Sequence, residues 1–161
     1  MSTQEAIKKI LDQKVKQYNK IDFIEKDPIC IPHQFTKQQD IEIAAFFAAI
    51  FAWGNRTTII NKSNELMNRM DGSPHEFCLR HTAKDLKKII GFKHRTFNEV
   101  DALYFIHFLS WFYRHEDSLE KAFLIGHTGA IDSMESILIQ FQQHFFSLED
   151  APSRTKKHIS S

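Results

Sequence analysis

The stretch AAIFAWGNRTTIINKS, residues 48–63, joins two helices of different character. A nearly continuous apolar run up to Trp53 ends at a small polar tip, Gly54-Asn55-Arg56, and an amphipathic pattern begins directly after it. A helix that is apolar on nearly all sides is buried, with other helices packed around it. Glycine commonly follows a helix C-terminus, and asparagine is a favourable N-cap. The stretch therefore predicts a central buried helix, a rigidly held polar tip and a second helix.

The rest of the chain has the same helical character. Gly and Pro are scarce, at 5 and 4 residues, whereas Phe occurs 15 times, and capping boxes precede several apolar runs at helical spacing. A long aromatic helix is expected to start after Thr96, with Glu99 completing its capping box. We found no strand signal and expect an all-α, irregular multi-helix array. The expected helices cover residues 3–20, 37–53, 56–70, 74–80, 83–90, 97–114, 118–125 and 130–146.

Composition narrows the class of protein. With 161 residues, 42% of them hydrophobic and 25% charged, the chain has the size and balance of one soluble globular domain. The N-terminus lacks the apolar core of a signal peptide, and no apolar run is long enough to cross a bilayer, so we expect a cytoplasmic protein with no membrane partner. Cys30 and Cys78 fit no metal or redox spacing and are expected to be free thiols.

Several classes of site are not indicated. The nine histidines include no pair one helical turn apart, the spacing that a zinc helix needs, so no metal site is expected. Neither a glycine-rich phosphate loop nor a nucleophile elbow is present, because the GHTG segment lacks the lysine and flanks of such motifs. No pair of acids stands out as a general acid and base. We therefore name no catalytic residue and no cofactor.

Two turns carry the candidate site. One is the tip with Asn55 and Arg56; the other is GFKHRTF, residues 91–97, in which Phe92 is followed by Lys93, His94 and Arg95. An aromatic side chain beside three potential cations, at a glycine turn before a helix, suits a nucleic-acid backbone: cations release counterions and an apolar wedge can enter a base stack. Taken singly, Phe92 also fits a core position, and the basic triplet also fits a solvated loop.

The order of these pieces resembles the first half of the six-helix core of the helix-hairpin-helix DNA glycosylases. The resemblance lies in IEIAAFFAAIFAWGNRTTIINKSNELMNRM followed by DLKKIIGFKHRTFNEVDALYFI. That resemblance implies that Asn55 fills the gap left by a flipped base and that Phe92 wedges the duplex. Lys93, His94 and Arg95 would then contact the backbone or the orphaned base. Gly54 stands where endonuclease III has glutamine, so the gap-filling role shifts to Asn55 or Arg56. The DPI…PH.F and AWGNR segments also resemble an uncharacterised bacterial domain family typified by Bacteroidetes proteins.

The resemblance implies three parts: an N-terminal helix and extended connection (residues 1–37), a glycosylase-like core (38–147) and a polar tail (148–161). The glycosylase hairpin, catalytic lysine and aspartate have no counterpart here, which implies a truncated piece, inactive in base excision by itself, of a longer protein whose own enzymatic status stays open. The expected function is recognition of double-stranded DNA, including damaged or distorted duplex. The main alternative is a non-enzymatic module for protein interaction or homo-oligomerisation through an exposed aromatic surface; a metal-dependent hydrolase or other enzyme is a third.

Overall fold

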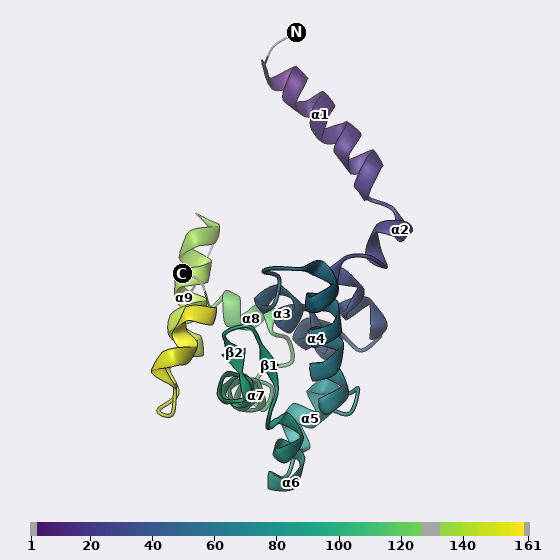
Figure 1. Ribbon diagram of the computed structural model, residues 1–161. Coiled ribbons are helices and arrows are strands. Elements are labelled where there is room, and N and C mark those ends of the chain that lie inside the picture. The colour runs from purple at the N-terminus through teal and green to yellow at the C-terminus, as the bar shows by residue number, and fades with distance from the viewer. Residues whose placement is uncertain (1–2, 127–132, 160–161) are drawn as a thin grey trace.

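A computed structural model describes residues 3–126 and 133–159 of the chain (Figure 1). These residues form a mostly helical body with one short hairpin. The elements are α1 (Thr3–Tyr18), α2 (Ile21–Ile24), η1 (Pro28–Cys30), η2 (Pro32–Gln34), α3 (Gln38–Ile50), α4 (Arg56–Arg69), α5 (Pro74–Arg80), α6 (Ala83–Leu86), η3 (Lys87–Ile89), β1 (Lys93–His94), β2 (Phe97–Asn98), α7 (Glu99–Phe112), α8 (Glu120–Phe123), α9 (Met134–Phe145) and η4 (Ser153–His158). The expected GHTG break and the start of the last expected helix lie partly outside the described residues.

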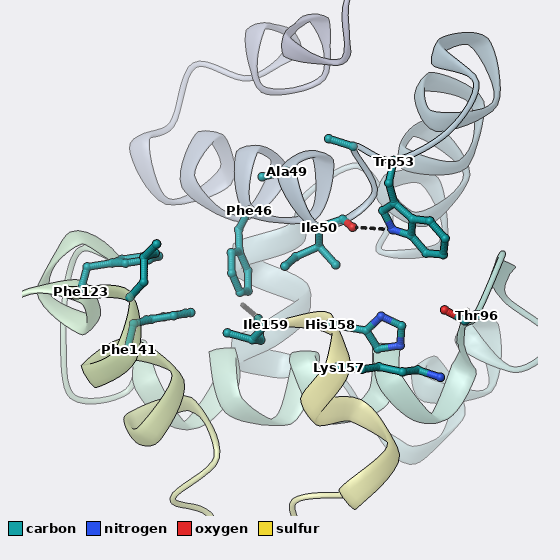
Figure 2. A pocket seen from close by; sticks show the side chains of 12 residues that line it. Phe46, Ala49, Ile50, Trp53, Thr96, Phe123, Phe141, Lys157, His158 and Ile159 are labelled. Carbon is teal, nitrogen blue, oxygen red and sulfur yellow. Dashed lines mark hydrogen bonds between the residues drawn. The ribbon is translucent and has the colours of Figure 1, made fainter. Parts of the chain in front are cut away.

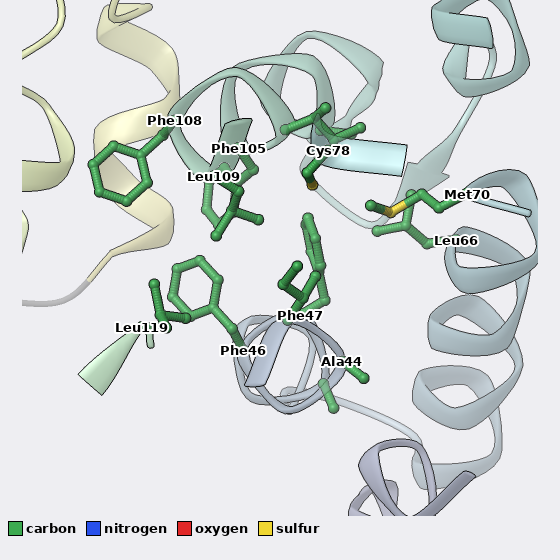
Figure 3. Packing of buried hydrophobic residues seen from close by; sticks show 14 of the residues in the cluster. Ala44, Phe46, Phe47, Leu66, Met70, Cys78, Phe105, Phe108, Leu109 and Leu119 are labelled. Carbon is green, nitrogen blue, oxygen red and sulfur yellow. The ribbon is translucent and has the colours of Figure 1, made fainter. Parts of the chain in front are cut away.

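Helix α3 occupies the centre of the fold, as its apolar run predicts. It contacts η1 and η2 on the chain before it and α4 and α5 after it. Its rings Phe46 and Phe47 face α7, where Phe105 lies 5.5 Å from Phe46 and 5.7 Å from Phe47 between centroids (Figure 3). Because the second half of α3 is apolar, it buries side chains against several helices at once.

Glu42 ties α3 to the segment that leads from α7 into α8. Its carboxylate accepts hydrogen bonds from the Tyr113 hydroxyl at 2.8 Å, the Ser118 hydroxyl at 2.7 Å and the Leu119 N–H at 2.8 Å. Burial opposes ionisation of Glu42, but these donors outweigh it and lower the pKa of the carboxyl group. The carboxylate therefore stabilises the connection as an ionised acceptor.

Helix α7 is the second core helix, and its start differs from the prediction by two residues. The N-cap is Asn98, which accepts from Val100 N–H, and Asp101 completes the capping box by accepting from Asn98 N–H at 2.8 Å. The predicted Thr96–Glu99 box is therefore wrong. Thr96 instead lies in the turn between β1 and β2, so the helix cannot begin there.

The expectation of no strands is also wrong, at one place. Lys93–His94 and Phe97–Asn98 pair as a two-stranded antiparallel hairpin, with Lys93 opposite Asn98 and His94 opposite Phe97. Side chains alternate along β1, so that Lys93 is exposed and His94 is buried. This alternation matters for the candidate site because it splits the basic triplet between two environments.

Helix α1 and the polar tail differ in how far they pack against the body of the fold. No residue of α1 is buried, and the helix extends away from the body (Figure 1). The polar tail, in contrast, forms η4 and packs beside α7, where Thr155 is fully buried. Gln142 of α9 also donates to the Ile159 carbonyl at 2.7 Å. The segment that follows α9 therefore belongs to the folded body.

Candidate nucleic-acid interface

The polar tip lies between α3 and α4, as predicted. Asn55 has an extended backbone conformation (φ −73°, ψ 126°), and its side-chain oxygen accepts from Thr58 N–H at 3.2 Å, which confirms it as the N-cap of α4. Asn55 is exposed, and its amide nitrogen donates to no group among the described residues. Arg56 is also exposed, with one weak ion pair to Asp27 at 3.7 Å. The tip thus retains a donor and a cation at the surface.

The second turn places its central residue in an uncommon conformation. Arg95 has φ +55°, in the left-handed region that non-glycine residues seldom occupy. It follows the buried His94, so the turn directs the Arg95 side chain away from the core and back toward α3.

The two turns meet, although 42 residues separate Trp53 from Arg95 in the sequence. The Arg95 guanidinium lies over the Trp53 ring at 4.6 Å, and its Nη1 donates to the Trp53 carbonyl at 3.4 Å. A cation over an indole face contributes about 0.5–1 kcal/mol at an exposed site. We call the exposed residues of these two turns, Trp53, Asn55, Arg56, Lys93 and Arg95, the rim.

Gly54 makes this contact possible for two separate reasons. Its φ of +111° is rarely adopted by other residues. In addition, a Cβ at this position would lie 3.2 Å from Arg95 Cζ and closer still to its Nη1. The backbone therefore favours glycine at this position, and any Cβ there would displace the end of the Arg95 side chain.

Two residues assigned to the site from the sequence are buried, and their assigned roles do not fit this structure. Phe92 is 1% exposed, and its ring stacks on Phe51 at 5.7 Å, so it cannot wedge a duplex without leaving the core. His94 is also 1% exposed, and neither of its ring nitrogens finds a hydrogen-bond partner among the described residues. Burial lowers the pKa of His94, which makes it a poor cation. The exposed aromatic beside the tip is instead Trp53, which is 38% exposed.

Positive charge at the rim is only partly neutralised. Within the part of the chain that the structure describes, Lys93 and Arg95 form no ion pair, whereas Lys62 nearby pairs with Glu65 at 2.6 Å. The rim thus presents two unpaired cations and the weakly paired Arg56. This local cluster exists despite a net charge of only +1 for the whole chain.

A buried polar cluster below the rim was not expected from the sequence. Asp101 is fully buried and accepts from the Thr155 hydroxyl at 2.7 Å; Arg154 Nη1 and His158 Nε2 lie 3.3 and 3.5 Å from its other oxygen. Arg154 also donates to the Thr96 carbonyl at 3.1 Å. Burial lowers the pKa of His158, although Asp101 acts in the opposite direction. The only sequence signal was the acidic N3 position of α7, which is common in helices.

Potential metal ligands are not clustered in residues 3–126 and 133–159. No group of three or more His, Cys, Asp or Glu side chains there is arranged to hold a metal ion. Cys30 and Cys78 are free, and burial raises the pKa of the Cys78 thiol well above its ordinary value. No helix in the same residues is long and apolar enough to cross a membrane.

The fold and the site define a mostly helical domain with a cationic, aromatic rim at the end of its central helix. The chain belongs to the family described as "Protein of unknown function (DUF2400)", whose model matches residues 27–161. This agrees with the sequence-based resemblance to an uncharacterised domain family. Comparison with curated proteins and with solved structures found no significant match.

Proposed function

We propose that the rim binds duplex DNA and favours distorted or damaged sites. The observation that carries this proposal is the contact between Arg95 and Trp53, which brings the cations of the hairpin beside the polar tip of α3. Cations on two turns that contact each other can bind one phosphate backbone, and each phosphate neutralised releases counterions. The buried helix α3 keeps the tip in one position, which reduces the ordering cost of binding.

Each rim residue has a role in this proposal. Arg56, Lys93 and Arg95 contact phosphates and fix the orientation of the protein on the duplex. The Asn55 amide nitrogen donates to an unpaired base or to the sugar, since its oxygen is engaged in capping α4. In place of the wedge that the sequence assigned to Phe92, Trp53 offers an exposed aromatic ring on which a splayed base can stack. We assign no base excision to this chain, because no acid–base pair lies among the rim residues.

Fluorescence anisotropy with two labelled duplexes, one intact and one containing an abasic site, tests the proposal. We expect tighter binding to the abasic duplex, because an unpaired gap costs less to open. Trp53→Leu and Asn55→Ser should reduce this preference while leaving weak binding to intact duplex. Serine keeps the N-cap, so the second variant separates contact from folding. Equal affinity of the wild-type protein for both duplexes would contradict damage recognition, and absence of binding at low salt would contradict the whole proposal.

A protein-interaction function is the second candidate, and α1 is the observation that favours it. Its apolar residues are exposed on the surface: Ile7, Ile10, Leu11, Val15 and Tyr18. An amphipathic helix of this kind binds in an apolar groove of a partner or against another copy of itself. Sedimentation velocity of the wild type and of Leu11→Glu distinguishes self-association, because only the wild type should form a dimer. A monomer at every concentration, for both proteins, would exclude the homo-oligomer.

A further inference from the structure

A pocket of about 610 Å³ opens on the side of α3 that faces the C-terminal elements (Figure 2). Pockets of roughly 300–1,000 Å³ are typical of small-molecule sites. The aromatic rings Phe46, Phe123 and Phe141 lie at one end, and Ile50 and Ile159 extend the apolar wall. Contributions from α3, α8, α9 and the segment after η4 make this a site built from distant parts of the chain.

Polar side chains gather at the other end of the pocket. Figure 2 shows Trp53, His158, Lys157 and Thr96 there, with the Lys157 ammonium directed toward Thr96. Lys157 is exposed and forms no ion pair with any described residue. An ammonium and a hydroxyl at the mouth of an apolar pocket are the few polar groups that orient a bound ligand.

The charge around the pocket favours an anion. None of the lining side chains is a carboxylate. The nearest buried acid, Asp101, lies behind His158 and is already engaged by Arg154, Thr155 and the Asn98 N–H. Its negative charge is therefore offset inside the protein, and Lys157 supplies the net charge at the mouth. A cationic ligand would meet an uncompensated ammonium.

We propose that this pocket binds a small apolar or aromatic monocarboxylate. The hydrocarbon part lies among the phenylalanine rings, and the carboxylate accepts from the Lys157 ammonium and the Thr96 hydroxyl. Burial of each methylene of the ligand favours binding by up to about fourfold. The pocket shares Trp53 with the rim but includes none of the rim cations, and ligand binding here does not depend on DNA binding.

Isothermal titration calorimetry with octanoate, butanoate, 1-octanol and octylamine tests the proposal. Octanoate should bind, butanoate far more weakly, and the neutral and cationic analogues less tightly than octanoate. Lys157→Met should weaken octanoate about fivefold, as expected for one partly exposed charge pair. Lys156→Met is the matched control, because Lys156 is exposed on the same helix and does not line the pocket.

A filling variant tests where the ligand sits. Ala49 lines the pocket from an exposed position on α3, so Ala49→Phe should abolish octanoate binding and leave the melting temperature nearly unchanged. Its affinity for DNA should also be unchanged, which separates this proposal from the preceding one. Absence of octanoate binding by the wild type overturns the proposal. The carboxylate assignment is overturned if octanol binds as tightly as octanoate, or if Lys156→Met weakens octanoate as much as Lys157→Met does. The location is overturned if Ala49→Phe binds octanoate like the wild type.

Discussion

Replacement of Phe92 tests whether this side chain belongs to the core or acts as a DNA wedge. The side chain is 1% exposed, stacks on Phe51 and meets Phe97 edge-on at 6.3 Å, so Phe92→Ala removes a complete ring from the core. Such substitutions cost about 3–5 kcal/mol through lost burial and the residual cavity. Lys62 and Arg69 also lie 5.7 and 5.8 Å from the ring centre, which places the expected loss in the upper part of that range.

Guanidinium chloride unfolding followed by circular dichroism measures this cost through the shift of the transition midpoint. Phe92→Leu, which keeps an apolar side chain, is the companion variant and should lose about 1–2 kcal/mol while binding DNA like the wild type. A loss below about 1 kcal/mol for Phe92→Ala, accompanied by a clear loss of DNA affinity in Phe92→Leu, would refute the reasoning. The ring would then act on the ligand and contribute little to the core.

Three further predictions concern stability. Gly54→Ala should cost about 1–2 kcal/mol in chemical unfolding and displace Arg95, because both the positive φ and the added Cβ are unfavourable; an unchanged midpoint would contradict this. Glu42→Gln should cost about 1–2 kcal/mol at pH 7, because the glutamine NH2 group cannot accept the hydrogen bonds that Tyr113, Ser118 and Leu119 donate to the carboxylate. The difference in stability from the wild type should shrink as the pH falls through the lowered pKa of Glu42, because the wild type then loses its ionised acceptor. Thermal unfolding should show a lower melting temperature at pH 5 than at pH 7. Burial lowers the pKa of His158 and of three other histidines, so the unfolded state binds more protons than the folded state in this range. A melting temperature that does not change between pH 5 and pH 7 would contradict the burial of those rings.

The helical architecture followed from local signals in the sequence. The apolar run of α3 predicted its central position. Asn55 was predicted as an N-cap because asparagine is favoured directly before a helix, and the structure confirms it. The Thr82–Asp85 capping box at the start of α6 is a local signal of the same kind. These features depend on residues within one or two helical turns, which a single sequence displays directly.

The features that were missed depend on alternation or on distant contacts. His94 reads as a third cation in sequence, but the two-residue strand β1 turns it into the core. Strands this short carry too little alternation to be distinguished from a loop. The sequence described the tail only as polar, because the buried carboxylate that holds it, Asp101, lies 54 positions away from Thr155 in the sequence. The contact of Trp53 with Arg95 likewise has no local signature.

The salt dependence of DNA affinity tests the central claim most directly. We would measure the affinity of the wild type, Arg95→Gln and Lys84→Gln for one short duplex over a range of salt concentrations. Lys84 is an exposed cation on α6, at the other end of α4 from Asn55, and serves as the charge-matched control (Figure 1). The account predicts that Arg95→Gln weakens binding and reduces the slope of log affinity against log salt by about 1, while Lys84→Gln matches the wild type. Identical slopes for all three proteins, or no binding at low salt, would contradict it.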